Sequence, residues 1–197
     1  MMREIDKFLK LFLIIFFVFS TKVEGKVLSV GEPSAKIIVK VFSSLTCPHC
    51  ANFHTAVFSN LKKDYIDKGL VRFEHHAFPL DLAALNAELV VRCQNNNIKK
   101  FELLEEIYKK QKTWALGSDI KKINDLIKKI GSNFSLSEEK MDACLNNDSV
   151  QDEILNERIE AQKKYKIDST PTVIINEKKY SGKTDYKNFK KVIEKNL

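Results

Sequence analysis

The chain has 197 residues, a formal net charge of +7, 44% apolar residues and four cysteines. This length suits one domain, with room for an insertion, and the apolar content is that of a globular chain rather than a disordered one. The positive charge is spread along the chain with no basic patch interleaved with aromatic residues, so we expect no nucleic-acid binding.

The N-terminus has the pattern of an export signal. Arg3, Lys7 and Lys10 precede an unbroken apolar run over residues 11–19, which a short polar stretch follows. This run is too short to cross a bilayer as a helix, which needs about 20 residues. We therefore predict a signal peptide over residues 1–25, with an uncleaved anchor as the alternative. Export would place the cysteines in an oxidising compartment, where disulfides persist.

The next elements in the chain are a strand, a helix and a second strand. Residues 35–44 are β-branched and apolar on both faces, which predicts a buried strand. A helical period begins at Cys47, and Gly69 suits the end of the helix. Residues 70–78 predict a second strand, parallel to the first. The apolar face of the helix comprises Cys50, Phe53, Val57 and Leu61.

The remaining chain is helical first and then returns to β structure. Residues 81–164 are Leu- and Lys-rich with helical periodicity and predict a module of four to six helices. Residues 169–182 predict two short strands joined by a turn, and a helix closes the chain. The predicted fold is α/β, in the order of a thioredoxin fold with an inserted all-helical domain. Its two halves are residues 26–80 and 165–197, and the insertion is residues 81–164.

The sequence "CPHC" lies where the first strand leads into the helix. Pro48 is favoured at the first helical position, which makes Cys47 the N-cap and Cys50 the third helical residue. The free amides and the dipole of the helix should stabilise a thiolate at Cys47, and a protonated His49 would add to this. We therefore expect a lowered pKa for Cys47, with Cys50 as a half-buried resolving thiol.

Other uses of the cysteine pair fit the sequence less well. A metal site needs further ligands, but His75 and His76 are adjacent on a strand and should point to opposite faces, while His54 is expected on a helix face. A c-type haem needs a histidine directly after Cys50. A purely structural bridge would close only a very short loop and gain little. Redox chemistry is favoured, and no metal or cofactor is expected.

These features resemble the DsbA family of periplasmic thiol:disulfide oxidoreductases, including its alphaproteobacterial-type members. The resemblance rests on the export signal, on "CPHC" after a strand, on the helical insertion and on "STPTVIIN" at residues 169–176. It implies catalytic roles for Cys47, Pro48, His49 and Cys50. It also implies that Thr170 and a cis-Pro171 lie beside the redox pair and bind substrate.

The resemblance bears on three further features of the sequence. Cys93 and Cys144 lie on apolar faces of different predicted helices, and relatives with a second cysteine pair imply that they form a structural disulfide. Some family members carry acidic residues near the redox pair, where this chain has Val41 and His54. Glu74, on the second predicted strand, is a candidate replacement.

The activity implied is donation of the Cys47–Cys50 disulfide to exported proteins with reduced cysteines, through a mixed disulfide on Cys47. The resemblance further implies a monomer in the periplasm, reoxidised by an integral-membrane DsbB-type quinone oxidoreductase. Three alternatives remain: a disulfide isomerase or reductase in the same compartment, a copper-binding module, and a chaperone that does not use its cysteines.

Overall fold

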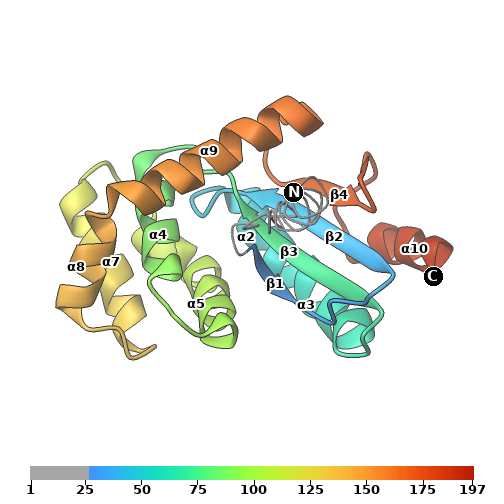
Figure 1. The fold of residues 1–197 in the computed structure, drawn as a ribbon, viewed down its shortest axis with the longest axis horizontal. Helices are drawn as coiled ribbons and strands as arrows, with labels where there is room; N and C mark the ends of the chain where they lie inside the picture. The colour runs from blue at the N-terminus through green and yellow to red at the C-terminus, as the bar shows by residue number, and fades with distance from the viewer. Residues whose placement is uncertain (1–26) are drawn as a thin grey trace, which may run out of the picture.

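The structure is a computed structural model that describes residues 27–197 (Figure 1). The predicted signal peptide over residues 1–25 lies outside the described residues. Among the helices that the structure describes, none combines the length and the apolar character needed to cross a membrane.

A mixed sheet forms the centre of the described chain, with strand order β1-β3-β2-β4-β5. The first predicted strand is β2 (Ile37–Ser43), which runs parallel to β3 (Val71–Ala77) as predicted. β4 (Thr172–Ile175) lies antiparallel on the other side of β2, and β5 (Lys178–Lys179) continues from it. The sequence did not predict β1 (Leu28–Val30), which pairs antiparallel with β3.

The two faces of β2 and β3 carry different surroundings. Val39, Val41 and Phe73 are fully buried in the large core that this face of the sheet shares with the helix after β2. The residues that alternate with these along each strand face the opposite side of the sheet. There Phe42 of β2 stacks on His76 of β3, with 4.7 Å between ring centroids. The adjacent histidines of β3 therefore point to opposite faces, as the period of a strand dictates.

The active-site helix runs without a break from Pro48 to Ile66. Its α-helical parts, α2 (Pro48–Asn52) and α3 (Ser59–Leu61), alternate with the wider π-helical segments η1 (Phe53–Phe58) and η2 (Lys62–Ile66). The four residues predicted to form its apolar face are all buried. His54 and Phe58 are buried as well, because each follows another buried residue by four positions and so lies on the same helical face. The buried residues of this helix are Cys50, Phe53, His54, Val57, Phe58, Leu61, Tyr65 and Ile66.

The helical module follows β3 and precedes β4, as predicted. In Figure 1 most of its helices are grouped to one side of the sheet, and α9 runs from that group back towards β4. α9 also packs on β3 and on α4, which ties the module to the sheet. The helices are α4 (Leu82–Arg92), α5 (Asn97–Lys109), α6 (Gln111–Trp114), α7 (Ile120–Ser132), α8 (Glu138–Leu145) and α9 (Asp148–Tyr165).

Polar side chains fix where several of these helices begin. Asp81, Asn96 and Asp119 each accept a hydrogen bond from a free amide in the first turn of α4, α5 or α7. At α8 the capping residue is Ser137, which accepts from the Lys140 amide at 3.2 Å. Ser135 instead has a φ of 61° in the preceding turn.

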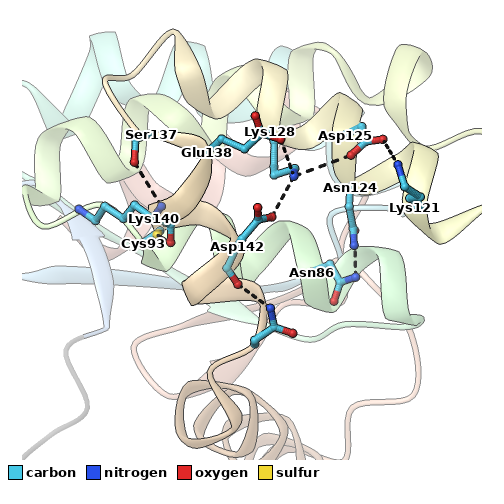
Figure 2. Close-up of polar contacts among 11 residues, drawn as sticks. Asn86, Cys93, Lys121, Asn124, Asp125, Lys128, Ser137, Glu138, Lys140 and Asp142 are labelled. Carbon is cyan, nitrogen blue, oxygen red and sulfur yellow. Dashed lines mark hydrogen bonds and ion pairs between the residues drawn. The ribbon is translucent and has the colours of Figure 1, made fainter.

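A disulfide and an ion cluster attach α8 to its neighbours. Cys93, at the end of α4, is bonded to Cys144 of α8, across a separation of 51 residues. Figure 2 shows Lys128 of α7 pointing between the carboxylates of Glu138 and Asp142, at 3.1 and 2.8 Å. Two independent links therefore hold α8 in the module.

The C-terminal half returns to the sheet and covers the active-site helix. Asn176 and Glu177 form the turn after β4, both with positive φ. α10 (Tyr186–Asn196) then packs on the active-site helix. Phe189, with its ring edge-on to Phe53, and Ile193 are fully buried, as the helical period predicts.

Candidate active site at the N-terminus of the helix

Cys47 stands at the junction between the loop after β2 and the active-site helix. It is the N-cap residue, Pro48 is the first helical residue, and Cys50 lies on the buried face, as the sequence predicts. Cys47 is 8% exposed, and Cys50 is fully buried rather than half-buried as the sequence predicted, while the side chains of Pro48 and His49 are exposed. Of the two cysteines, only Cys47 therefore has any surface that a partner can reach.

The surroundings of the two thiols drive their acidities apart. A hydrogen bond from the Cys50 thiol is the main cause that lowers the pKa of Cys47 to about 5, against the opposing effect of burial. Thr170 and the backbone amides of Cys50 and His49 lower it further. Burial, and then the interaction with Cys47, raises the pKa of Cys50 far above its usual range. In the dithiol form Cys47 is thus a stable thiolate, and Cys50 keeps its proton.

The segment before β4 lies directly against the reactive sulfur. The Cys47 sulfur is 3.4 Å from the carbonyl oxygen of Thr170, and the peptide bond between Thr170 and Pro171 is cis. Both residues are only half-buried. The structure therefore brings together Cys47 and the two residues that the sequence marks for substrate binding, although they are more than 120 positions apart.

The helical module supplies a residue that the sequence reasoning missed. The buried side-chain amide of Gln111, on α6, donates to the carbonyl oxygens of Leu45 at 2.7 Å and Cys47 at 3.0 Å. On the same loop, the Thr46 hydroxyl donates to Asp81, the residue that caps α4, at 2.7 Å. The module thus fixes the backbone on which Cys47 is carried.

A hollow of 570 Å³ opens beside this loop, between the active-site helix and the module. Leu116, at its edge, is 66% exposed, and Lys109 and Lys112 add positive charge. The hollow is lined by Thr46, Pro48, Ala51, Asn52, Thr55, Tyr108, Lys109, Gln111, Lys112, Ala115 and Leu116.

The sequence suggested Glu74 as an acidic group for the redox pair, and the structure places it elsewhere. Glu74 is paired with Arg72 and His76 on the sheet face opposite the active-site helix, and these partners outweigh burial and lower its pKa. Val41 is fully buried, and His54 is buried in the core rather than on an open helix face. The buried acid on the Cys50 side of the sheet is Glu88 of α4, which is hydrogen-bonded to His75.

The other two cysteines do not belong to this site. Cys93 and Cys144 are bonded to each other within the helical module, and Cys47 and Cys50 are present as free thiols. Within residues 27–197, no three His, Cys, Asp or Glu side chains are grouped in a way that could hold a metal ion.

A reactive cysteine at the N-terminus of a helix, beside a cis-proline loop on a mixed sheet, defines a thioredoxin-fold redox site. The family profile of thioredoxin matches residues 23–195. The crystal structure of Wolbachia pipientis alpha-DsbA1 superposes with a TM-score of 0.79 at 27% identity, covering 87% of this chain and 90% of that one. The chain therefore belongs to the thioredoxin family, and its fold is that of DsbA with the helical insertion.

Two sequence relatives carry names that refer to disulfide chemistry. A protein named as a protein-disulfide oxidoreductase in Rickettsia bellii (strain RML369-C) is 28% identical over 156 residues, or 79% of this chain. Disulfide bond formation protein D of Bacillus subtilis (strain 168) is 29% identical over 179 residues, covering 85% of this chain and 75% of that protein. The chain spans 59% of the length of the Rickettsia relative.

Proposed function

We propose that the protein is a thiol:disulfide oxidoreductase that donates the Cys47–Cys50 disulfide to exported proteins. The observation that carries this proposal is the placement of the two thiols, with Cys47 at the N-terminus of the helix beside Thr170 and Cys50 fully buried. This placement lowers the pKa of Cys47 and raises that of Cys50. A stabilised Cys47 thiolate favours the dithiol form, so the disulfide is readily given away.

The proposed reaction has two exchange steps. A substrate thiolate attacks the Cys47 sulfur, the bond between Cys47 and Cys50 breaks, and a substrate–Cys47 disulfide forms. A second substrate thiolate then attacks the substrate sulfur of that bond, and Cys47 leaves as its stable thiolate. The substrate gains a disulfide and the two electrons remain on Cys47 and Cys50, of which Cys50 takes up one proton.

The surroundings of Cys47 support the proposed substrate-binding role of Thr170 and Pro171. The Thr170 carbonyl touches the Cys47 sulfur, so a chain that attacks Cys47 must pass along this segment. An extended substrate could pair with its backbone, as in β-strand addition. The hollow between the active-site helix and the module offers room for apolar side chains on the other side of Cys47.

The remaining parts of the proposed cycle rest on the resemblance to DsbA proteins. We place the protein in the periplasm as a monomer, reoxidised by an integral-membrane quinone-linked partner of the DsbB type. Removal of residues 1–25 as a signal peptide, and the division at residues 80 and 165 into a two-part domain and an insertion, are part of the same proposal.

The test is the reduction potential of the Cys47–Cys50 pair, measured by equilibration with glutathione buffers. A disulfide donor is expected near about −120 mV, an isomerase near about −180 mV and a reductant near about −270 mV. A value near the last would contradict the proposal. In a Cys50→Ala variant the Cys47 thiolate can attack a substrate disulfide and release one substrate thiolate, but no Cys50 thiol can resolve the product, so mixed disulfides should accumulate. The Cys47→Ser variant should accumulate none. Oxidation of substrates that survives Cys47→Ser would equally contradict it.

A further inference from the structure

His54, one turn after Cys50 on the same buried helix face, belongs to a cluster of buried polar side chains that the exchange steps above do not use. His54, His75, Glu88 and Tyr108 come from η1, β3, α4 and α5, and each is at most 4% exposed. Polar and charged groups are costly to bury, and four from separate elements meet here in an otherwise apolar core. We call them the buried polar cluster.

The members of the buried polar cluster are in close contact. The rings of His54 and Tyr108 are stacked, with 4.1 Å between their centroids. The ring of His75 lies 6.2 Å from that of His54 and 6.3 Å from that of Tyr108. At the far end, His75 Nε2 is hydrogen-bonded to Glu88 Oε1.

Several polar atoms of the cluster have no hydrogen-bond partner within residues 27–197. They are both ring nitrogens of His54, Nδ1 of His75 and the hydroxyl oxygen of Tyr108. A buried donor or acceptor without a partner is destabilising, so such groups call for a reason other than stability.

The buried polar cluster extends from the redox site to a second opening. Tyr108 lines the hollow beside Pro48, while His75 and Glu88 line a separate cavity of 180 Å³. That cavity is also lined by the charged residues Arg92, Lys100 and Glu153. The cluster therefore lies between the two hollows.

Electrostatics connect both ends of the cluster through Tyr108. Burial is the main cause that raises its pKa, and negative charge on Cys50 and on Glu88 raises it further. Burial also lowers the pKa of His54, so its imidazole is neutral at rest. For Glu88, the attraction of His75 outweighs burial and lowers the pKa. Negative charge on Cys50 and negative charge on Glu88 therefore both act on the pKa of the Tyr108 hydroxyl.

Cys50 must gain and lose a proton during the redox cycle, and this cluster could exchange it. When a thiolate attacks Cys47, the sulfur of Cys50 leaves with the electron pair in a site that water does not reach, and it must gain a proton. When the disulfide forms again, Cys50 must lose that proton. No acidic residue on β2 or on the active-site helix is buried beside Cys50 to serve it.

We propose that the buried polar cluster carries this proton between Cys50 and the cavity beside Glu88. The inference rests on the proposed redox role of Cys47 and Cys50. As the bond between them breaks, Cys50 accepts one proton from the cluster through Tyr108, and solvent at the His75–Glu88 pair returns one proton to the cluster. Reoxidation moves one proton the opposite way, so the cluster itself is unchanged after each cycle.

The charged groups around the cluster are compatible with this direction. Arg92 faces Glu88 from within α4 and is held by Glu157 and Glu153, and Lys100 faces the cavity from α5. Their positive charge stabilises the Glu88 carboxylate. On the Cys50 side, the charges that act on Tyr108 are those of the two redox sulfurs, and β2 contributes the uncharged Ser43 hydroxyl.

The decisive variant is Tyr108→Phe, because it removes only a hydroxyl that makes no hydrogen bond within the described chain. The readout is the rate at which reduced glutathione opens the Cys47–Cys50 disulfide, measured between pH 4 and 9 in H₂O and D₂O. We expect at least about a tenfold slower reaction with an altered pH profile, as for loss of a general acid. Stability to urea should be unchanged or higher.

A matched pair of variants tests the other end of the cluster. Glu88→Gln keeps a hydrogen-bonding group next to His75 but removes the carboxylate, and should also slow the reaction and change its pH profile. Glu74→Gln makes the same change beside His76, on the opposite face of β3, and should do neither. In all three variants the thiolate absorbance of Cys47 should titrate as in the parent protein.

The outcomes separate the two proposals. If the parent protein opens its disulfide normally and both Tyr108→Phe and Glu88→Gln keep its rate, pH profile and isotope effect, the proton route is wrong while the redox function stands. If Glu74→Gln has the same effect as Glu88→Gln, the route is also wrong. If the parent protein fails to exchange disulfides through Cys47, the proposed function itself fails.

Discussion

Gln111 of the helical module lies outside the redox site but fixes the geometry of the loop that carries Cys47. Its amide donates to two backbone carbonyls of the loop that ends at Cys47, and both acceptors are buried with it. A buried carbonyl that loses its donor costs about 1–3 kcal/mol, because water cannot replace the bond. The position of the Cys47 sulfur against Thr170 and the helix amides therefore depends on a side chain of the helical module.

We predict that Gln111→Leu raises the pKa of Cys47, slows disulfide exchange and lowers the free energy of unfolding by about 1–3 kcal/mol. The pKa is measured by thiolate absorbance and the stability by urea unfolding. The control is Gln94→Leu, since Gln94 is equally buried and donates to the Phe134 carbonyl inside the module. The Gln94→Leu variant should lose stability without a change in the pKa of Cys47 or in the rate of disulfide exchange. Equal effects of the two variants on Cys47 would refute the positioning role.

At the scale of residues, the sequence predicted what is local in the chain. The N-cap position of Cys47, the buried face of Cys50 and the opposite directions of His75 and His76 follow from short-range periodicity. Gln111 and Glu88 could not be found in this way. Each meets its partner only when an element far along the chain packs against the sheet, and neither has a sequence pattern of its own.

The elements were predicted well wherever they carry a full period. The strand before Cys47 and the parallel strand after it occur as predicted. The number of helices in the module, α4 to α9, falls within the predicted four to six. β1 was missed because a three-residue strand has no alternation to detect. The π-helical turns of η1 were missed because the apolar pattern carries no signal for them. The burial of His54 was missed although it lies four positions after Cys50 on the same helical face.

The bond between Cys93 and Cys144 allows a prediction at the scale of helices. It closes a loop of about 50 residues that contains α5, α6 and α7 and most of α8, and such a crosslink stabilises a fold by about 4 kcal/mol in the chain-entropy model. We predict a loss of about 2–4 kcal/mol when the bond is absent, measured by urea unfolding.

Reduction tests this without altering a buried side chain. In a Cys47→Ser/Cys50→Ser background, a strong reductant acts only on the bond between Cys93 and Cys144. The unfolding midpoint should fall when the reductant is added, and a Cys93→Ala/Cys144→Ala version of the same background should not respond. An identical midpoint with and without reductant in the first background would show that the bond contributes no stability.

For the whole molecule, the lowered pKa of Cys47 links redox state to stability. A hydrogen bond from Cys50, aided by Thr170 and the helix amides, holds the folded-state pKa near 5, below the ordinary value near 9. A group with a lowered folded-state pKa stabilises the fold above its unfolded pKa, and the effect vanishes as the pH falls through the folded pKa. At pH 7 the gain amounts to roughly 2–3 kcal/mol, present only in the dithiol form.

The second thiol limits the range of this effect without reversing it at neutral pH. Burial raises the pKa of Cys50, so the folded protein keeps a thiol there, while the unfolded chain ionises only above about pH 8.5. A raised folded-state pKa costs nothing below that value and lowers stability above it. The dithiol form should therefore gain stability from pH 5 to about 8.5 and lose stability above that pH.

We predict that the stability of the dithiol form relative to the disulfide form falls by roughly 2–3 kcal/mol between pH 7 and pH 4.5. Urea unfolding of both forms at each pH measures this, because every titration that the two forms share cancels in the difference. The Cys47→Ser variant exists only in the reduced form, and its stability relative to the disulfide form of the parent protein should show no such dependence. A constant difference across this range would mean that the fold does not stabilise the thiolate. Because about 1.4 kcal/mol corresponds to about 30 mV for a two-electron couple, the measured free-energy difference also gives the contribution of the Cys47 thiolate to the reduction potential of the Cys47–Cys50 pair.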